Sequence, residues 1–179
     1  MESPEDLKNA IKTFYKNKGI EINENNIIIL PEGNNSIVDA TYKDKKFQVK
    51  NVPSQAKKAE ELLVKGREIK EKNVKSFIKS GVCKKINKTR RMECGYNAEE
   101  FKKYFIKEPA KKLKGVSGEG IILLFWASTF TPSFAKEVIL EDREIPNILK
   151  SLRFKEIYLV SSRENILLYK SKANQEKLF

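Results

Sequence analysis

Residues 37–52 read IVDATYKDKKFQVKNV, and this stretch predicts two short strands joined by a polar turn over residues 43–46. Successive side chains on a strand point to opposite faces, so each strand has one apolar and one polar face. Asp39 lies on the polar face of the first strand, and Gln48 and Lys50 lie on the polar face of the second. The polar residues of the two strands therefore gather on one side of the hairpin.

The register of this hairpin decides which polar side chains meet. A turn centred between Asp44 and Lys45 places Asp39 opposite Lys50 and puts Gln48 on the neighbouring pair of the same face. Opposed residues lie about 5 Å apart and diagonal ones about 7–8 Å apart. We therefore expect Asp39, Gln48 and Lys50 to converge on one patch. The alternative is an exposed ion pair between Asp39 and Lys50, which adds little stability.

Together these three side chains have a chemical use. A carboxylate and an amide oxygen at this separation can share a hard cation such as Mg²⁺ or Mn²⁺, which also binds phosphate oxygens. A neighbouring lysine then orients a water, or helps to deprotonate it, for attack on phosphorus. The chain has no histidine, which excludes the Ser/His/Asp and Cys/His forms of nucleophilic catalysis. Cys83 and Cys94 alone cannot form the usual four-ligand zinc site, and we expect reduced thiols.

Apolar periodicity and turn signals predict the elements around the hairpin. Residues 4–18 form an amphipathic helix capped by Ser3, residues 27–30 a strand and residues 54–81 a long helix. The later segments are expected to be a helix over 98–106 that Pro109 interrupts, a strand buried on both faces over 120–128, a short helix over 146–152, and a hairpin over 155–170 with its turn at 162–164. This order predicts an α/β fold with a mixed central sheet flanked by helices.

With Asp on one strand and Gln-x-Lys on the next, the chain resembles the restriction-endonuclease-like PD-(D/E)XK nucleases, whose core is a helix, three strands, a helix and a further strand. The resemblance covers residues 3–81 and 121–128, and the run FQVKNV into a helix is similar to archaeal Holliday-junction resolvases and type IV restriction enzymes. It implies a restriction-endonuclease-like core. The implied site has Asp39 and Gln48 as metal ligands, the backbone carbonyl of Val49 as a further ligand, and Lys50 as the catalytic lysine. Many members of the family add an acid from the first helix, for which Glu5 is the first candidate and Glu2 the second.

Two positions depart from the pattern of the family. Ile37 and Val38 precede Asp39 where the name-giving proline would stand. Gln48 is neutral where glutamate is commoner, which removes a negative charge from the implied metal site. The affinity for the cation should fall unless Glu5 or the substrate phosphate compensates.

The charge of the chain points to a polyanionic partner. Lys and Arg number 36 against 24 Asp and Glu, a formal net charge of +12, and the segment from Cys83 to Lys114 holds eleven Lys/Arg against four Glu. Neutralising phosphates releases condensed counterions and so favours nucleic-acid binding. The candidate phosphate-binding residues are Lys84, Lys85, Lys88, Arg90, Arg91, Lys111 and Lys112. A solvated loop, or a general preference for lysine, is the alternative.

Four aromatic residues interleave with these charges. Tyr96, Phe101, Tyr104 and Phe105 could stack on bases, but their helical spacing favours a core face. Trp126 is expected in the core.

The length of 179 residues suits one well-packed domain. We divide it into a nuclease-like core over residues 1–81 and 116–170, a basic insertion over 82–115, and a C-terminal tail over 171–179. No apolar run is long enough for a membrane helix and no signal peptide is visible, so a cytoplasmic location is expected.

Two functions remain open from the sequence. One is a metal-dependent DNA endonuclease, for which the family resemblance also implies a homodimer when two strands are cut. The other is a non-catalytic basic protein that binds DNA or RNA. The final residues QEKLF resemble a motif that docks on sliding clamps through Gln175, Leu178 and Phe179, with an ordinary frayed terminus as the alternative.

Overall fold

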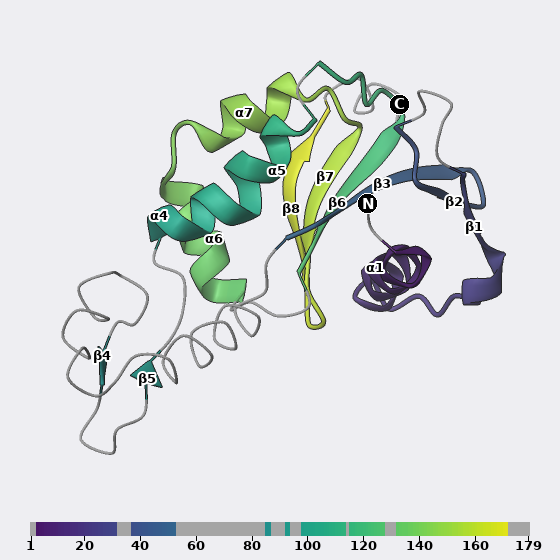
Figure 1. Ribbon diagram of the computed structural model, residues 1–179, viewed down its shortest axis with the longest axis horizontal. Coiled ribbons are helices and arrows are strands. Elements are labelled where there is room, and N and C mark those ends of the chain that lie inside the picture. The colour runs from purple at the N-terminus through teal and green to yellow at the C-terminus, as the bar shows by residue number, and fades with distance from the viewer. Residues whose placement is uncertain are drawn as a thin grey trace, which may run out of the picture.

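A computed structural model of the chain describes residues 3–31, 37–52, 85–86, 92–93, 98–113, 115–127 and 132–171. Its centre is a mixed six-stranded sheet with the strand order β1–β2–β3–β6–β7–β8 (Figure 1). The strands are β1 (Ile27–Ile29), β2 (Ala40–Tyr42), β3 (Lys45–Asn51), β6 (Ile121–Trp126), β7 (Glu156–Val160) and β8 (Asn165–Lys170), and a separate pair is formed by β4 (Lys85–Ile86) and β5 (Met92–Glu93). Strands β3, β6 and β7 are parallel and the other neighbours in the six-stranded sheet antiparallel, which confirms the predicted mixed sheet.

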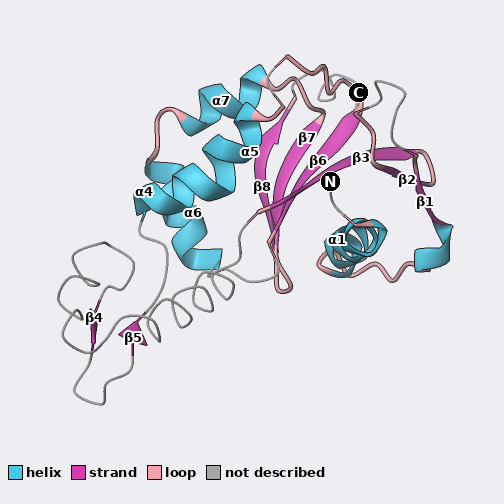
Figure 2. Cartoon of the chain, in the orientation of Figure 1, coloured by secondary structure: helices cyan, strands magenta, loops and turns pink. Residues whose placement is uncertain are grey.

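Helices cover both faces of this sheet (Figure 2). One face packs against α1 (Pro4–Lys16), which Ser3 caps as predicted by accepting a hydrogen bond from the backbone N–H of Asp6. The other face packs against a helical run of α4 (Ala98–Phe101), the π-helix η3 (Lys102–Lys107) and α5 (Glu108–Lys111), together with α6 (Pro132–Glu141) and α7 (Ile145–Ser151). A short 3₁₀ turn, η1 (Glu24–Asn26), precedes β1.

Each face of the sheet therefore has its own apolar core. Phe14 of α1 packs edge to face on Phe47 of β3, with ring centroids 6.0 Å apart. On the other face, Phe101 and Phe105 stack with centroids 4.5 Å apart and pack with the side chains of β6. The strand predicted to be buried on both faces is confirmed, since Ile121–Phe125 are all buried.

The register predicted for the β2–β3 hairpin is wrong. Ala40 pairs with Phe47 and Tyr42 with Lys45, so the turn contains only Lys43 and Asp44. Lys43 takes a left-handed conformation with φ 54°, which a two-residue turn between twisted strands favours. The polar faces are kept, but the partner of Asp39 changes from Lys50 to Gln48.

The helix predicted to end before Pro109 continues through it, which corrects that prediction. The N–H of Glu108 bonds to the carbonyl of Lys103, five residues back, so the turn before the proline is wider than in an α-helix. A proline collides with the carbonyl four residues back in a regular helix, and a π-turn relieves that collision. Phe101 and Phe105 lie in the core as predicted, whereas Tyr104 is half-buried; Tyr96 lies outside the described residues.

Other predicted elements have mixed outcomes. The hairpin of β7 and β8 and the short helix α7 are confirmed within a residue or two, whereas α6 has no counterpart in the prediction. Trp126 is half-buried rather than in the core. The long helix predicted over residues 54–81 lies outside the described residues. Within the described ranges, no helix has the length and apolar character needed to cross a membrane.

Asp142 connects α7 with the helical run on the same face of the sheet. Its Oδ1 accepts hydrogen bonds from the backbone N–H groups of Glu144 (2.8 Å) and Ile145 (3.0 Å), and its Oδ2 pairs with Lys102 Nζ at 3.0 Å. Burial acts to raise the pKa of Asp142, but the hydrogen bonds from Lys102 and from the two N–H groups hold that pKa below its ordinary value. The folded state therefore favours the carboxylate.

We expect Asp142→Asn to lose stability at neutral pH but not in acid. The contribution of the carboxylate is fully present above its ordinary pKa of about 4 and is lost as pH falls through the lowered pKa. Thermal unfolding of both proteins between pH 7 and pH 2 measures this, with exposed Glu141→Gln as the control. A difference between wild type and variant that is the same at all pH values would contradict the expectation.

Candidate functional site

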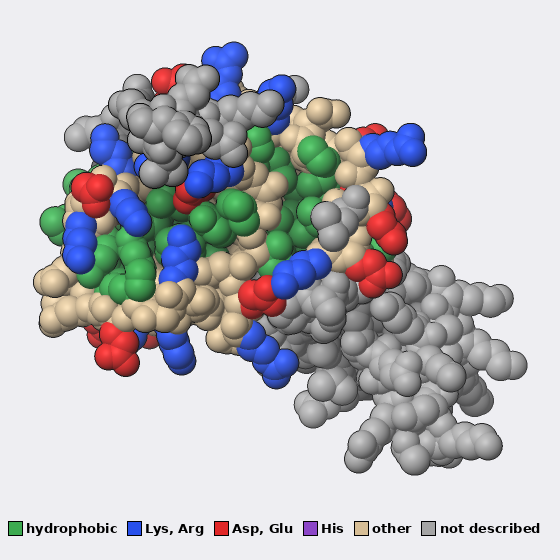
Figure 3. Space-filling view, turned by 180° about the vertical axis from the view of Figure 1, so that it is seen from behind, with side chains coloured by type: hydrophobic (Ala, Val, Ile, Leu, Met, Phe, Trp, Pro, Cys, Tyr) green, Lys and Arg blue, Asp and Glu red, His purple; other side chains and the backbone are tan. Residues whose placement is uncertain are grey.

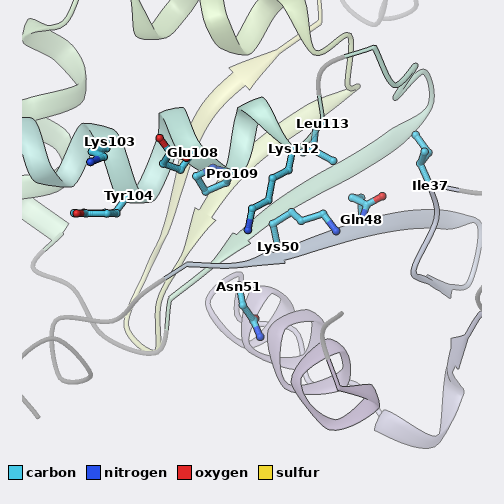
Figure 4. A pocket seen from close by; sticks show the side chains of 10 residues that line it. All are labelled: Ile37, Gln48, Lys50, Asn51, Lys103, Tyr104, Glu108, Pro109, Lys112 and Leu113. Carbon is cyan, nitrogen blue, oxygen red and sulfur yellow. The ribbon is translucent and has the colours of Figure 1, made fainter. Parts of the chain in front are cut away.

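A cavity of about 780 Å³ lies between β3 and the helical run α4–η3–α5 (Figure 4). Strand β3 contributes Gln48, Lys50 and Asn51 to its lining. The helical side contributes Lys103, Tyr104, Glu108, Pro109, Lys112 and Leu113, and Ile37 lies at one end. We call this cavity the β3–α5 groove. It brings together two residues predicted for catalysis, Gln48 and Lys50, with one predicted for phosphate binding, Lys112.

Asp39 and Gln48 are in direct contact beside the groove. Gln48 Nε2 donates a hydrogen bond to Asp39 Oδ2 at 2.7 Å, and the backbone N–H of Val49 donates to the same oxygen at 2.8 Å. The N–H of Asp39 in turn bonds to the carbonyl of Phe47 at 2.9 Å. These bonds hold the carboxylate firmly against β3. The corrected register is the reason, because it moves Asp39 alongside Gln48.

Gln48 lines the groove but is only 3% exposed, so it lies at the floor of the groove. A buried amide needs partners for its polar atoms, and Asp39 supplies one for Nε2. The amide oxygen points away from β3 on the side of Ile37 (Figure 4). Lys50, two residues further along the same face of β3, is half-buried and extends its amine toward Gln48 (Figure 4).

Glu5 and the Val49 side chain do not join this group. Glu5 is exposed in the first turn of α1, and α1 packs on the opposite face of the sheet. The Val49 side chain is fully buried on that same opposite face, so only its backbone faces Asp39. Glu2 lies outside the described residues.

The helical wall of the groove adds Lys103 and Glu108, which the sequence did not indicate, and Tyr104, which it named only as an aromatic residue that could stack on bases. Lys103 Nζ lies 5.0 Å from the centre of the Tyr104 ring, a cation–π contact, and both residues line the end of the groove away from Ile37. Glu108 also lines the groove, where its Oε1 pairs with Lys111 Nζ at 3.1 Å. A π-turn next to a cavity is a recognised mark of functional sites, but single-sequence periodicity does not reveal it.

The predicted phosphate-binding residues divide into three sets. Lys112 lines the groove, and Lys111 is exposed and paired with Glu108. Lys85 lies in β4, opposite Glu93 of β5. Lys84, Lys88, Arg90 and Arg91 lie outside the described residues, as do the tail residues Gln175, Leu178 and Phe179.

The residues beside the groove fit a hard cation in ligand type but not in their present orientation. A carboxylate, an amide oxygen and a backbone carbonyl are the oxygen ligands that Mg²⁺ prefers. The Gln48 amide, however, turns its nitrogen toward Asp39. It must rotate by half a turn for its oxygen and the carboxylate to face one ion. Among the described residues, no three Asp, Glu or Cys side chains form a group suited to a metal.

Comparisons with protein-family models, with curated proteins and with solved structures find no match to this chain. Its function must therefore be argued from the geometry of the groove. The resemblance to PD-(D/E)XK nucleases stays a prediction based on the Asp39 and Gln-x-Lys pattern.

Proposed function

We propose that this protein is a metal-dependent DNA endonuclease with a restriction-endonuclease-like core. The observation that carries the proposal is that Asp39, Gln48 and Lys50 come together at one groove: Asp39 lies against Gln48, and both Gln48 and Lys50 line the groove from the same face of β3. The parallel pairing of β3 with β6 behind this contact gives the site a rigid support. A formal net charge of +12 favours a polyanionic substrate.

Each residue has a defined role in this proposal. Asp39, the Gln48 amide oxygen and the Val49 carbonyl would hold Mg²⁺ or Mn²⁺. When bound, such a cation stabilises the negative charge that develops on the phosphate oxygens. The Lys50 ammonium donates a hydrogen bond to the attacking water and orients it toward phosphorus. The water oxygen bonds to phosphorus and releases one proton to solvent, the P–O bond to the leaving oxygen breaks, and that oxygen takes up a proton from solvent.

One observation favours a second function, that of a non-catalytic nucleic-acid-binding protein. Gln48 brings no charge to the site, and its amide nitrogen already satisfies Asp39 without a cation. A pair of this kind is stable by itself. In that case the groove and the basic residues bind nucleic acid, and Asp39 only stabilises the β2–β3 hairpin through its hydrogen bonds to Gln48 and Val49.

A cleavage assay separates the two functions. Labelled duplex, single strand, flap and four-way junction are incubated with the protein in Mg²⁺ or Mn²⁺, and in a chelator as the control. The endonuclease is expected to cut at least one of these DNAs in either metal and none in the chelator. Salt-sensitive binding to DNA without cutting in either metal would contradict the endonuclease and support the second function.

A further inference from the structure

The shape of the β3–α5 groove limits what can reach its floor. Figure 4 shows the groove running along β3, with Lys103 and Tyr104 at one end, Lys112 and Lys50 in its middle, and Gln48 and Ile37 at the other end. Gln48 is 3% exposed. A phosphate that reacts beside Gln48 must therefore enter the groove, because a nucleic acid lying on a flat outer surface cannot reach this buried side chain.

The volume of the groove sets the size of the segment that enters. About 780 Å³ lies within the range of roughly 300–1,000 Å³ typical of cavities that enclose one small molecule. This is room for one or two nucleotides, and not for a double helix. On the face shown in Figure 3, the described Lys and Arg side chains lie among hydrophobic and acidic ones.

The charges in the groove suit a single nucleic-acid strand. Lys50 enters from the sheet, and Lys103 and Lys112 enter from the helical side, so cations stand on both walls. Among the described residues of the lining, Glu108 is the acidic one, and it is paired with Lys111. Grooves that bind single strands combine such cations along the backbone with aromatic side chains that contact bases, and Tyr104 provides the aromatic wall.

We propose that the β3–α5 groove binds single-stranded DNA, with phosphates between Lys50 and Lys112 and a base against Tyr104. This inference rests on the proposed function for its choice of DNA, and it names the substrate class as DNA with unpaired nucleotides at the site of attack. The binding itself requires neither metal nor hydrolysis. It can therefore be tested separately from cleavage.

The test is fluorescence anisotropy with a labelled 12-nucleotide strand and with its duplex, both in chelator so that no cutting occurs. Wild-type protein is expected to bind the single strand at least about 10-fold more tightly than the duplex. Equal or tighter binding of the duplex would overturn the proposal. Tighter binding of an RNA strand of the same sequence would overturn the assignment to DNA.

Matched lysine variants locate the binding site. Lys112→Met keeps most of the aliphatic stem and removes the charge, and Lys16→Met does the same at an exposed position of α1 on the opposite face of the sheet. Lys112→Met is expected to weaken single-strand binding by about 3- to 10-fold and to lower the slope of log affinity against log salt by about 0.7, the value for one phosphate. Equal effects of the two variants would overturn the proposal.

Tyr104 provides a second readout that does not depend on charge. Tyr104→Leu is expected to weaken single-strand binding about 5-fold or more, and Tyr104→Phe to retain it, because a base contacts the ring. Equal binding by these two variants would remove Tyr104 from the site. If the protein prefers single strands but does not cut DNA in metal, the groove binds single strands and the endonuclease is rejected. If it cuts DNA but does not prefer single strands, the endonuclease stands and this inference is rejected.

Discussion

Replacing Lys50 with methionine is expected to lower the rate of metal-dependent DNA cleavage at least about 100-fold, while DNA affinity falls only a few-fold. The reason is that Lys50 is the cationic side chain of β3 that lines the groove beside Gln48. Its ammonium contacts the reacting water, whereas binding is shared among several lysines. Methionine retains most of the length and apolar stem, so the strand keeps its packing. Single-turnover cleavage with saturating protein measures the effect on the reaction alone.

Lys46→Met is the matched control for this variant. Lys46 lies on the same strand and the same face as Lys50, but it is exposed and does not line the groove. We expect cleavage by Lys46→Met to stay within a few-fold of wild type. Equal losses for the two variants would show that charge on the strand matters rather than position, and would contradict the role of Lys50.

Asp39 needs a different substitution, because its carboxylate also has a structural task. Asp39→Ala would leave the N–H of Val49 and the amide of buried Gln48 without their acceptor, at a cost of about 1–3 kcal/mol each. Asp39→Asn retains one acceptor oxygen and removes the charge. Cleavage should again fall at least about 100-fold in Asp39→Asn, and a folded variant with wild-type activity would reject Asp39 as a metal ligand.

The sequence predicts the central sheet well because its strands carry strong local signals. The apolar run from Ile121 to Phe125 predicts a buried strand, and the turn after Val160 separates two further strands. The polar face with Asp39 and Gln48 is also predicted, since alternation along a strand does not depend on the turn. Their direct contact is not, because it depends on Lys43 adopting a positive φ, which a lysine seldom does.

The helical wall of the groove is harder to predict for a physical reason. A π-turn contains more residues than an α-turn and so rotates the following side chains around the helix axis. Periodicity calculated for a regular helix correctly places Tyr104 against the core, but it gives neither Tyr104 nor Lys103 a place in a groove, although both line one. Lys112 is predicted from the density of charge around it and not from its place in the fold. Helix α6 has only a weak amphipathic pattern, and its start signal, the Thr131–Pro132 pair in the sequence, is not used in the prediction.

Gly118→Ala is expected to be the most destabilising small substitution in the loop that joins the groove to β6. A Cβ at this position would lie 2.5 Å from Cγ and Cδ1 of Phe154, and 2.7 Å from Cδ2. Phe154 is fully buried, and Cγ lies too close to the backbone for the ring to swing away. We expect a loss of about 3 kcal/mol in the free energy of unfolding, at the upper end for overpacking. The midpoint of thermal unfolding should fall by roughly 6–12 °C.

A double variant shows whether the ring of Phe154 is the cause. In a Phe154→Leu background the added methyl meets a smaller side chain, so the cost of Gly118→Ala should fall by half or more, a coupling that distant sites do not show. Ser117→Ala, at the exposed neighbouring position, should change stability by less than about 0.5 kcal/mol. Strict additivity would mean that strain elsewhere in the loop is responsible. This loop follows Leu113 in the wall of the groove. If Gly118→Ala displaces the loop, single-strand binding should weaken as well. The close approach of Gly118 to buried Phe154 would then affect both the stability of the core and the shape of the groove.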